Sequence, residues 1–255
     1  VLPSAEGDVL PGTLKAQLDS EVALVSVMMV NNEVGTIQPI EELCELAHAK
    51  GALFHTDAVQ AVGHMDINVR DLNIDYLSAS AHKFNGMKGC GFLFMKNGCE
   101  LTAYADGGSQ EKGYRAGTEN VAGIIAMAAA LKNNCDHLKE NRRHILQLED
   151  ALLSKLTGTG IAYTRNGGKN TLPGIISLSF PHADGEAILH RMDLMGVCIS
   201  TGSACNSQDT EVSHVLKAIG LDEDLAKGTI RISLGKYNTM DDIDKIVRGL
   251  QKILG

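Results

Sequence analysis

Short apolar runs alternate with amphipathic helical patterns through the first hundred residues, and this alternation limits the possible fold more than any other feature. Residues 22–30 (VALVSVMMV) form a continuous apolar run that is typical of a buried strand. Residues 38–50 carry apolar side chains at helical spacing and stop before Gly51, where a helix can end. Further strands are predicted at residues 52–57, 74–80 and 90–95. This order predicts α/β units with a largely parallel sheet.

The pattern changes after Thr118. Two long helical stretches come first, and shorter strands and helices then alternate to the end of the chain. The helices are predicted at 119–132, 138–156, 184–194, 211–219 and 240–254, and the strands at 173–180, 196–200 and 228–234. We therefore expect a smaller α+β domain over residues 137–255, after a first domain over residues 1–136.

Composition excludes several classes of protein. The net charge is -8 and no run is rich in Lys or Arg, which argues against nucleic acid or an anionic membrane as the main partner. No apolar stretch is long enough to span a bilayer. None of the six cysteines forms a CxxC pair, and no Cys/His cluster has zinc-ligand spacing. We expect reduced thiols, no bound metal and a cytoplasmic protein.

Polar residues follow three of the predicted strands, where an open α/β sheet binds its ligands. Asn31, Asn32 and Glu33 follow the first strand, Asp57 and Gln60 the second, and Ser80, His82 and Lys83 the third. Taken singly, the asparagines suit a turn, Asp57 suits a helix cap, and His82 and Lys83 suit a surface. Taken together, they predict a site for one small ligand.

An amine, a carboxylate and neutral or cationic hydrogen-bond donors can together bind one cofactor. Pyridoxal phosphate needs a lysine for covalent attachment, an anion at its pyridine nitrogen, and donors for its phosphate. Lys83, Asp57, and Ser80 with His82 match these needs.

Six segments of the sequence together resemble the cysteine desulfurases of aminotransferase class V, and the resemblance covers essentially the whole chain. They are VNNEVGTIQP (30–39), HTDAVQAVG (55–63), SASAHKFNGMKGCGF (78–92), YRAGTEN (114–120), STGSACNS (200–207) and TIRISLGKYNT (229–239). The resemblance implies the type I fold of pyridoxal-phosphate-dependent transferases, with a large cofactor-binding domain over 1–136. The small domain over 137–255 would then carry the catalytic cysteine.

The resemblance also implies a role for each matching residue. Lys83 would hold pyridoxal phosphate, Asp57 would pair with its pyridine nitrogen, and Gln60 would contact its ring oxygen. Ser80 and His82 would bind the phosphate, and Thr118 would reach it from the partner subunit of a homodimer. Asn32 and Arg231 would hold the substrate carboxylate, for which a guanidinium is well shaped.

Cys205 lies in a run of small residues, and the resemblance makes it the thiol that takes sulfur from L-cysteine and leaves L-alanine. Small residues favour mobility, and attack on sulfur requires a thiolate. We expect the other cysteines to be structural, since each lies in an apolar or helical stretch. They are Cys44, Cys90, Cys99, Cys135 and Cys198, of which Cys198 is the least secure.

Roughly a third of the family's chain has no counterpart here, including its first strands, a phosphate-binding turn and a histidine that stacks on the cofactor. A sheet without those strands has an open edge. Three alternatives therefore stay open: another class V enzyme such as a selenocysteine lyase or aminotransferase, a fragment that only dimerises or docks, and a plain α/β binding domain. The segment around Cys205 resembles that of the family members with a longer loop, and this resemblance implies an iron–sulfur scaffold protein as the sulfur acceptor.

Overall fold

The computed structural model describes residues 1–201 and 212–255, which form two compact units. Unit 1 contains residues 1–17, 30–39 and 139–255, and unit 2 contains residues 18–29 and 40–138. Residues 1–17 and 30–39 therefore belong to the same unit as the C-terminal part of the chain, whereas we expected them in the first domain. The boundary between the units near the middle of the chain lies between residues 138 and 139. Two expected site residues, Asn32 and Arg231, accordingly belong to the same unit.

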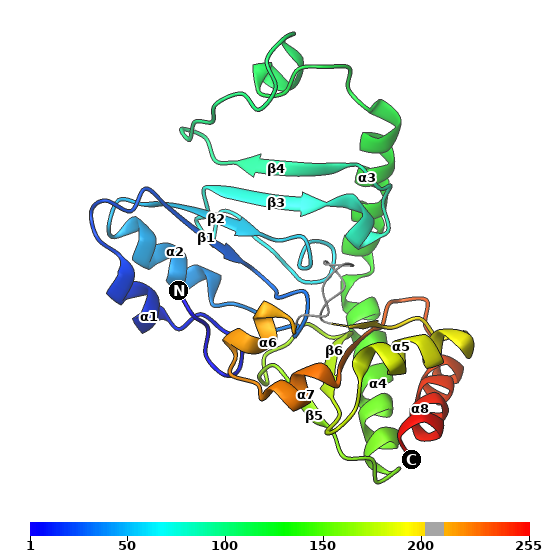
Figure 1. Ribbon diagram of the computed structural model, residues 1–255. Helices are drawn as coiled ribbons and strands as arrows, with labels where there is room; N and C mark the ends of the chain where they lie inside the picture. The colour runs from blue at the N-terminus through cyan, green and yellow to red at the C-terminus, as the bar shows by residue number, and fades with distance from the viewer. Residues whose placement is uncertain (202–211) are drawn as a thin grey trace. The chain divides into compact units, whose positions relative to one another are not determined.

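Unit 2 is built on one four-stranded sheet, in the order β1-β2-β3-β4 (Figure 1). The strands are β1 (Leu24–Met28), β2 (Leu53–Asp57), β3 (Tyr76–Ser80) and β4 (Gly91–Met95). The first three pair in parallel, and β4 runs antiparallel to β3. The predicted strands and the largely parallel sheet are confirmed.

One face of this sheet is well covered. Val25, Phe54 and Leu77 are buried on it, and α2 (Ile40–His48) packs against β1 and β2. On the opposite face, Leu24 and Leu93 are each 50% exposed. The prediction of a buried first strand therefore holds for one face only, because Leu24 on the other face of β1 is half exposed in the described part of unit 2. The remaining elements of unit 2 are η1 (Ala81–Phe84), η2 (Gln110–Gly113) and α3 (Val121–Asp136).

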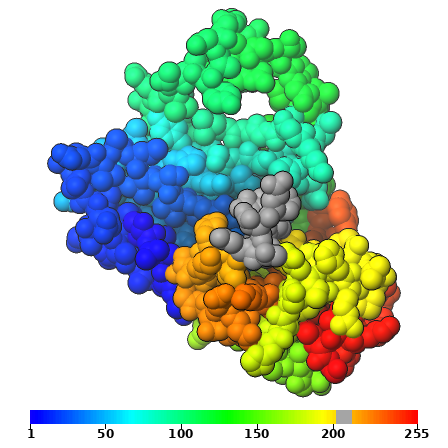
Figure 2. All heavy atoms as spheres, in the orientation of Figure 1, coloured from blue at the N-terminus to red at the C-terminus, as the bar shows by residue number. Residues whose placement is uncertain are grey.

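Unit 1 contains a second four-stranded sheet, in the order β5-β6-β8-β7 with every pair antiparallel. Its strands are β5 (Thr164–Asn166), β6 (Ile175–Ser179), β7 (Ser200–Thr201) and β8 (Thr229–Ser233). Its helices are α1 (Pro11–Gln17), α4 (Leu138–Thr157), α5 (Gly185–Leu194), α6 (His214–Ala218), α7 (Glu223–Lys227) and α8 (Met240–Leu254). Apolar side chains from α4, α5, α8 and the sheet form one core. Figure 2 shows α5 and α8 lying side by side at the surface.

The predicted helices are present with ends shifted by a few residues, but the shortest elements were missed. Helices α1 and α7 and strand β5 were not predicted, and β7 is shorter than the predicted strand 196–200. These elements have two to seven residues, too few to show a hydrophobic period. Among the described residues, no helix combines the length and the apolar character that a bilayer-spanning segment requires.

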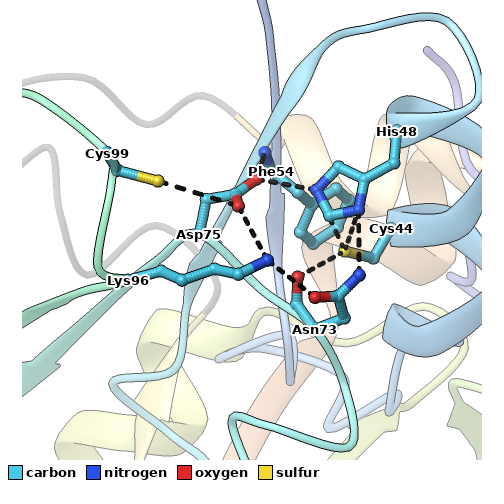
Figure 3. Close-up of polar contacts among 7 residues, drawn as sticks. All are labelled: Cys44, His48, Phe54, Asn73, Asp75, Lys96 and Cys99. Carbon is cyan, nitrogen blue, oxygen red and sulfur yellow. Dashed lines mark hydrogen bonds and ion pairs between the residues drawn. The ribbon is translucent and has the colours of Figure 1, made fainter.

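A buried carboxylate joins several elements of unit 2 at the start of β3. The Asp75 side chain is only 5% exposed, and its Oδ2 atom accepts from His48 Nε2 at 2.7 Å and from the Phe54 amide at 2.8 Å (Figure 3). Lys96 Nζ lies 3.6 Å from Oδ1, and the Cys99 thiol donates to Oδ1 at 3.8 Å. Burial alone would raise the pKa of Asp75, but these hydrogen bonds and the charges of His48 and Lys96 bring it below its ordinary value.

The same cluster contains a thiol. Burial raises the pKa of Cys44 to about 11, and the nearby Asp75 charge adds to this effect. Cys44 is therefore a protonated thiol at neutral pH, and its contacts with the His48 ring at 3.8 Å do not make it a nucleophile. The expected structural role fits Cys44. Cys135 and Cys198 are exposed, although each lies in an apolar or helical stretch of the sequence.

We expect Asp75→Asn to lower the free energy of unfolding by about 1–3 kcal/mol at pH 7, because it weakens hydrogen bonds to a buried charged group. The pKa of Asp75 is depressed in the folded state, so its contribution is complete above the unfolded value near 3.9 and is lost as pH falls through the folded pKa. Urea unfolding at pH 7 and at pH 3 measures both effects. Asp136→Asn, which removes an exposed pair with Lys132, is the control. An equal change in the two variants at pH 7 would contradict this account.

Candidate active site

The C-terminal ends of β2 and β3 lie at one edge of the unit 2 sheet. Five of the predicted site residues lie at these ends or in the segments directly after them. Asp57 is the last residue of β2, and Gln60 lies in the loop after it. Ser80 ends β3, and His82 and Lys83 lie in η1 directly beyond. Because β2 and β3 are parallel neighbours, with Asp57 opposite Ser78, their ends lie at the same edge.

The loop after β2 is fastened to η1. His64 Nε2 contacts the Lys83 carbonyl at 2.8 Å, and the Asn134 side chain donates to the Phe84 carbonyl at 2.7 Å. Gly63 has φ +79°, and a Cβ atom there would lie 2.9 Å from the Cβ of Phe84. The close approach therefore requires glycine. It holds the loop with Gln60 against the turn with Lys83.

Residues within η1 divide into anchors and exposed groups. Phe84 and Ala81 are buried, whereas His82 and Lys83 are exposed. The Ser80 hydroxyl lies 3.1 Å from His82 Nδ1. No ion pair holds the Lys83 amine within the described part of the chain. The exposed Lys83 side chain is therefore accessible to a ligand.

Asp57 supplies the carboxylate of this edge. Its Oδ1 atom accepts the Val59 amide at 2.9 Å, which stabilises the turn after β2 and is not the helix cap of the alternative interpretation, because residues 59–64 form turns. Its Oδ2 atom has no hydrogen-bond partner among the described residues. An amine, a carboxylate with one free oxygen, a hydroxyl and an imidazole therefore meet at this edge. This donor set fits pyridoxal phosphate.

Arg231 and Asn32 form a second group, within unit 1. Arg231 lies in β8 between Ser177 of β6 and Ser200 of β7, and its Nη1 atom donates to the Asn32 carbonyl at 2.9 Å. Its Nε atom is buried and has no partner among the described residues. A buried guanidinium donor without an acceptor is costly. A ligand carboxylate would satisfy it.

The segment around Asn32 is a tight turn. Asn31 Oδ1 accepts the amides of Glu33 at 2.8 Å and Val34 at 3.0 Å, so Asn31 has the turn role that was the alternative reading. The Asn32 side chain has no such bond within the described residues. Glu33 instead accepts from the Ser213 hydroxyl at 2.6 Å. That contact joins this turn to the start of α6 in the same unit.

Thr118 lies in the segment between η2 and α3 of unit 2. It lines a cavity of about 800 Å³ together with Arg115, β4 and the first turns of α3. Figure 2 shows the surface hollowed below this green segment. The reach of Thr118 to a partner subunit stays a prediction. Cys205 lies outside the described residues, so its place in the site stays a prediction as well.

Sequence reasoning missed several polar residues that support the site. His55 lies two residues before Asp57 on the same strand, and it contacts Ser26 of β1 and Ser78 of β3. Strand alternation was the available signal, since residues two apart share a face. His64 and the Glu33–Ser213 pair had no such signal, because each depends on a loop conformation.

An α/β unit with a lysine, an aspartate and phosphate donors at one sheet edge defines a class of cofactor-binding protein, and comparison with known families is consistent with it. The family profile described as "Aminotransferase class-V" matches residues 1–246. The chain therefore belongs to the class V aminotransferase family.

Individual proteins within this family that are similar to the chain are named cysteine desulfurase. "Cysteine desulfurase IscS" of Clostridium botulinum is 44% identical over 252 residues, which are 98% of this chain and 64% of that protein. "Cysteine desulfurase IscS" of Methanosarcina thermophila is 40% identical, over 97% of this chain and 61% of that protein. The chain thus spans less than two thirds of the length of these curated relatives.

Solved structures agree. A "NifS-like protein" has a TM-score of 0.92 and 36% identity, over 100% of this chain and 67% of that one. The NifS-like protein from Rickettsia africae has a TM-score of 0.91 and 33% identity, over 99% of this chain and 68% of that one. The predicted family and the partial type I fold are confirmed.

Arg231→Lys should weaken binding of L-alanine, a small amino acid used here as a carboxylate probe, by roughly 10- to 100-fold, because lysine keeps the charge but loses the Nε donor and the two-pronged geometry. Titration calorimetry in the presence of pyridoxal phosphate measures this dissociation constant. Arg248→Lys on the exposed side of α8 should leave it unchanged. Equal affinity in wild type and Arg231→Lys would show that this guanidinium does not bind the carboxylate.

Proposed function

We propose that this chain forms part of a pyridoxal-phosphate-dependent cysteine desulfurase, which converts L-cysteine into L-alanine and carries the released sulfur as a persulfide on Cys205. The observation that carries the proposal is the single sheet edge that holds Asp57, Ser80, His82 and Lys83. The relatives named cysteine desulfurase, 40–44% identical over nearly the whole chain, support this particular reaction.

Cofactor binding would use the residues of unit 2. Pyridoxal phosphate, when bound, withdraws electrons from the α-carbon of an amino acid. The free Oδ2 atom of Asp57 would accept the pyridine N–H, and Gln60 would contact the ring oxygen. Ser80 and His82 would donate to the phosphate, with Thr118 of a partner subunit as a further donor. Lys83 would attach the cofactor.

Substrate binding would use the residues of unit 1. Arg231 has a buried Nε donor with no acceptor among the residues that the structure describes, and a substrate carboxylate would accept from it. Asn32 lies beside it, and its side-chain amide would donate to the same carboxylate. These contacts would hold the substrate by its carboxylate and so restrict the position of the adjoining α-carbon. The Lys83 amine, once displaced by the substrate, would remove the α-proton.

Sulfur transfer would use Cys205. Its thiolate attacks the substrate sulfur, a sulfur–sulfur bond forms, and the carbon–sulfur bond of the substrate breaks. The electron pair of that bond stays with the substrate carbon, which is protonated to give L-alanine. Atoms and electrons balance without an external oxidant, because the sulfur of L-cysteine ends as the outer sulfur of the persulfide.

The proposal extends to partners and location. A sulfur-acceptor protein, such as an iron–sulfur scaffold, would take the persulfide sulfur. The functional form would be a cytoplasmic homodimer, since Thr118 is proposed to act in the neighbouring site. A selenocysteine lyase or an aminotransferase is the alternative within the family, and an aminotransferase would not require Cys205.

Cys205→Ser should retain the absorbance of bound pyridoxal phosphate but lose persulfide formation and release of L-alanine by at least about 10³-fold, because it removes the nucleophile. Mass spectrometry of the protein after incubation with L-cysteine detects the persulfide, and amino-acid analysis detects L-alanine. Turnover by Cys205→Ser at the wild-type rate would overturn the role of Cys205.

Two lysine variants complete this experiment. Lys83→Ala should lose both the cofactor absorbance and the reaction. Lys50→Ala, in the exposed turn after α2, should keep both. A Lys83→Ala protein that still forms the persulfide would contradict the proposed cofactor site.

A further inference from the structure

His55 links three neighbouring strands of unit 2 on the face that carries Asp57. Its Nδ1 atom lies 2.8 Å from the Ser26 hydroxyl of β1, and its Nε2 atom lies 3.2 Å from the Ser78 hydroxyl of β3. Ser26 is the register partner of His55, and Ser78 is the register partner of Asp57. On this face of the sheet, His55 is therefore the residue directly before Asp57, the proposed partner of the pyridine nitrogen.

The charge state of the ring follows from its surroundings. Burial lowers the pKa of His55 below its ordinary value, and the Asp57 charge offsets this only in part. The ring is therefore neutral at pH 7, with one nitrogen that donates and one that accepts.

The Ser78 hydroxyl decides which nitrogen accepts. Among the described residues, the only side-chain partner of Ser78 is His55 Nε2, and no hydrogen bond joins Ser78 to Asp57. Ser78 is partly buried, so its proton needs an acceptor, and His55 Nε2 is the one in place. The Nδ1–H group then donates to Ser26, whose hydroxyl is exposed and can donate its own proton to water.

We propose that His55 is a positioning residue that accepts the Ser78 hydroxyl proton and thereby leaves the Oδ2 atom of Asp57 free for the pyridine N–H of pyridoxal phosphate. This inference rests on the proposed cofactor site. Without the imidazole, the Asp57 carboxylate would be available to Ser78, because the two residues are register partners in β2 and β3 and their side chains share one face of the sheet. A hydroxyl bound to Asp57 would compete with the cofactor for that oxygen.

The test is a double-mutant cycle read by the affinity for pyridoxal phosphate, measured by absorbance titration of the purified chain. His55→Leu should raise the dissociation constant roughly tenfold, the effect of a competing hydrogen bond to a charged group. Ser78→Ala alone should change it less than about twofold, since it removes the competing hydroxyl. His55→Leu with Ser78→Ala should return to within about twofold of wild type. That rescue would not occur if His55 only stabilised the sheet.

His55→Gln keeps an acceptor and serves if His55→Leu fails to fold, which circular dichroism reports; the proposal then expects His55→Gln to bind within about threefold of wild type. An unchanged dissociation constant in His55→Leu, or a loss that Ser78→Ala does not restore, would overturn this inference and leave the proposed function standing. A His55→Gln loss of tenfold or more would overturn it as well. Absence of pyridoxal phosphate binding in wild type would overturn both.

Discussion

The parallel pairing of β2 with β3 is the constraint on which the proposed cofactor site depends. It sets Asp57 opposite Ser78 and brings the ends of both strands to one edge. The turn that follows β3 exposes Lys83 because Phe84 is buried beneath it, and His64 fastens the loop after β2 to that turn. A shift of one residue in this register would send Asp57 to the other face of the sheet.

Unit 1 depends on a different constraint, the antiparallel packing of β8 between β6 and β7. This places Arg231 on an inner strand of the sheet, where its Nε atom is buried. One donor is satisfied by the Asn32 carbonyl, and the buried Nε atom, which has no partner among the described residues, is proposed to bind the substrate carboxylate. The two units thus contribute different functions to the proposed reaction: one supplies an amine and an anion for a cofactor, and the other supplies a cationic group for a carboxylate.

Much of this could be predicted from the sequence, because long periodic segments and the polar residues that follow them are local patterns. The strands ending at Asp57 and Ser80 were predicted within two residues of their observed bounds. Some elements, such as α1 and α7, were missed because they are short, and the other failures depended on long-range contacts. Whether a face of β1 is exposed depends on which segments pack against it. The hydrogen bonds of His55 with Ser26 and of Glu33 with Ser213 join residues that lie far apart in the chain. Resemblance to a family, rather than physics, gave Thr118 and Cys205 their roles.

The proposed cofactor site requires Lys83 to attach pyridoxal phosphate at the edge formed by β2 and β3. Borohydride reduction of the chain after addition of pyridoxal phosphate, followed by peptide mass mapping, identifies the lysine that carries the cofactor. We expect a pyridoxyl group on the peptide that contains Lys83, and its loss in Asp57→Ala. A label on other lysines at the same level, or no label in wild type, would contradict the proposed site.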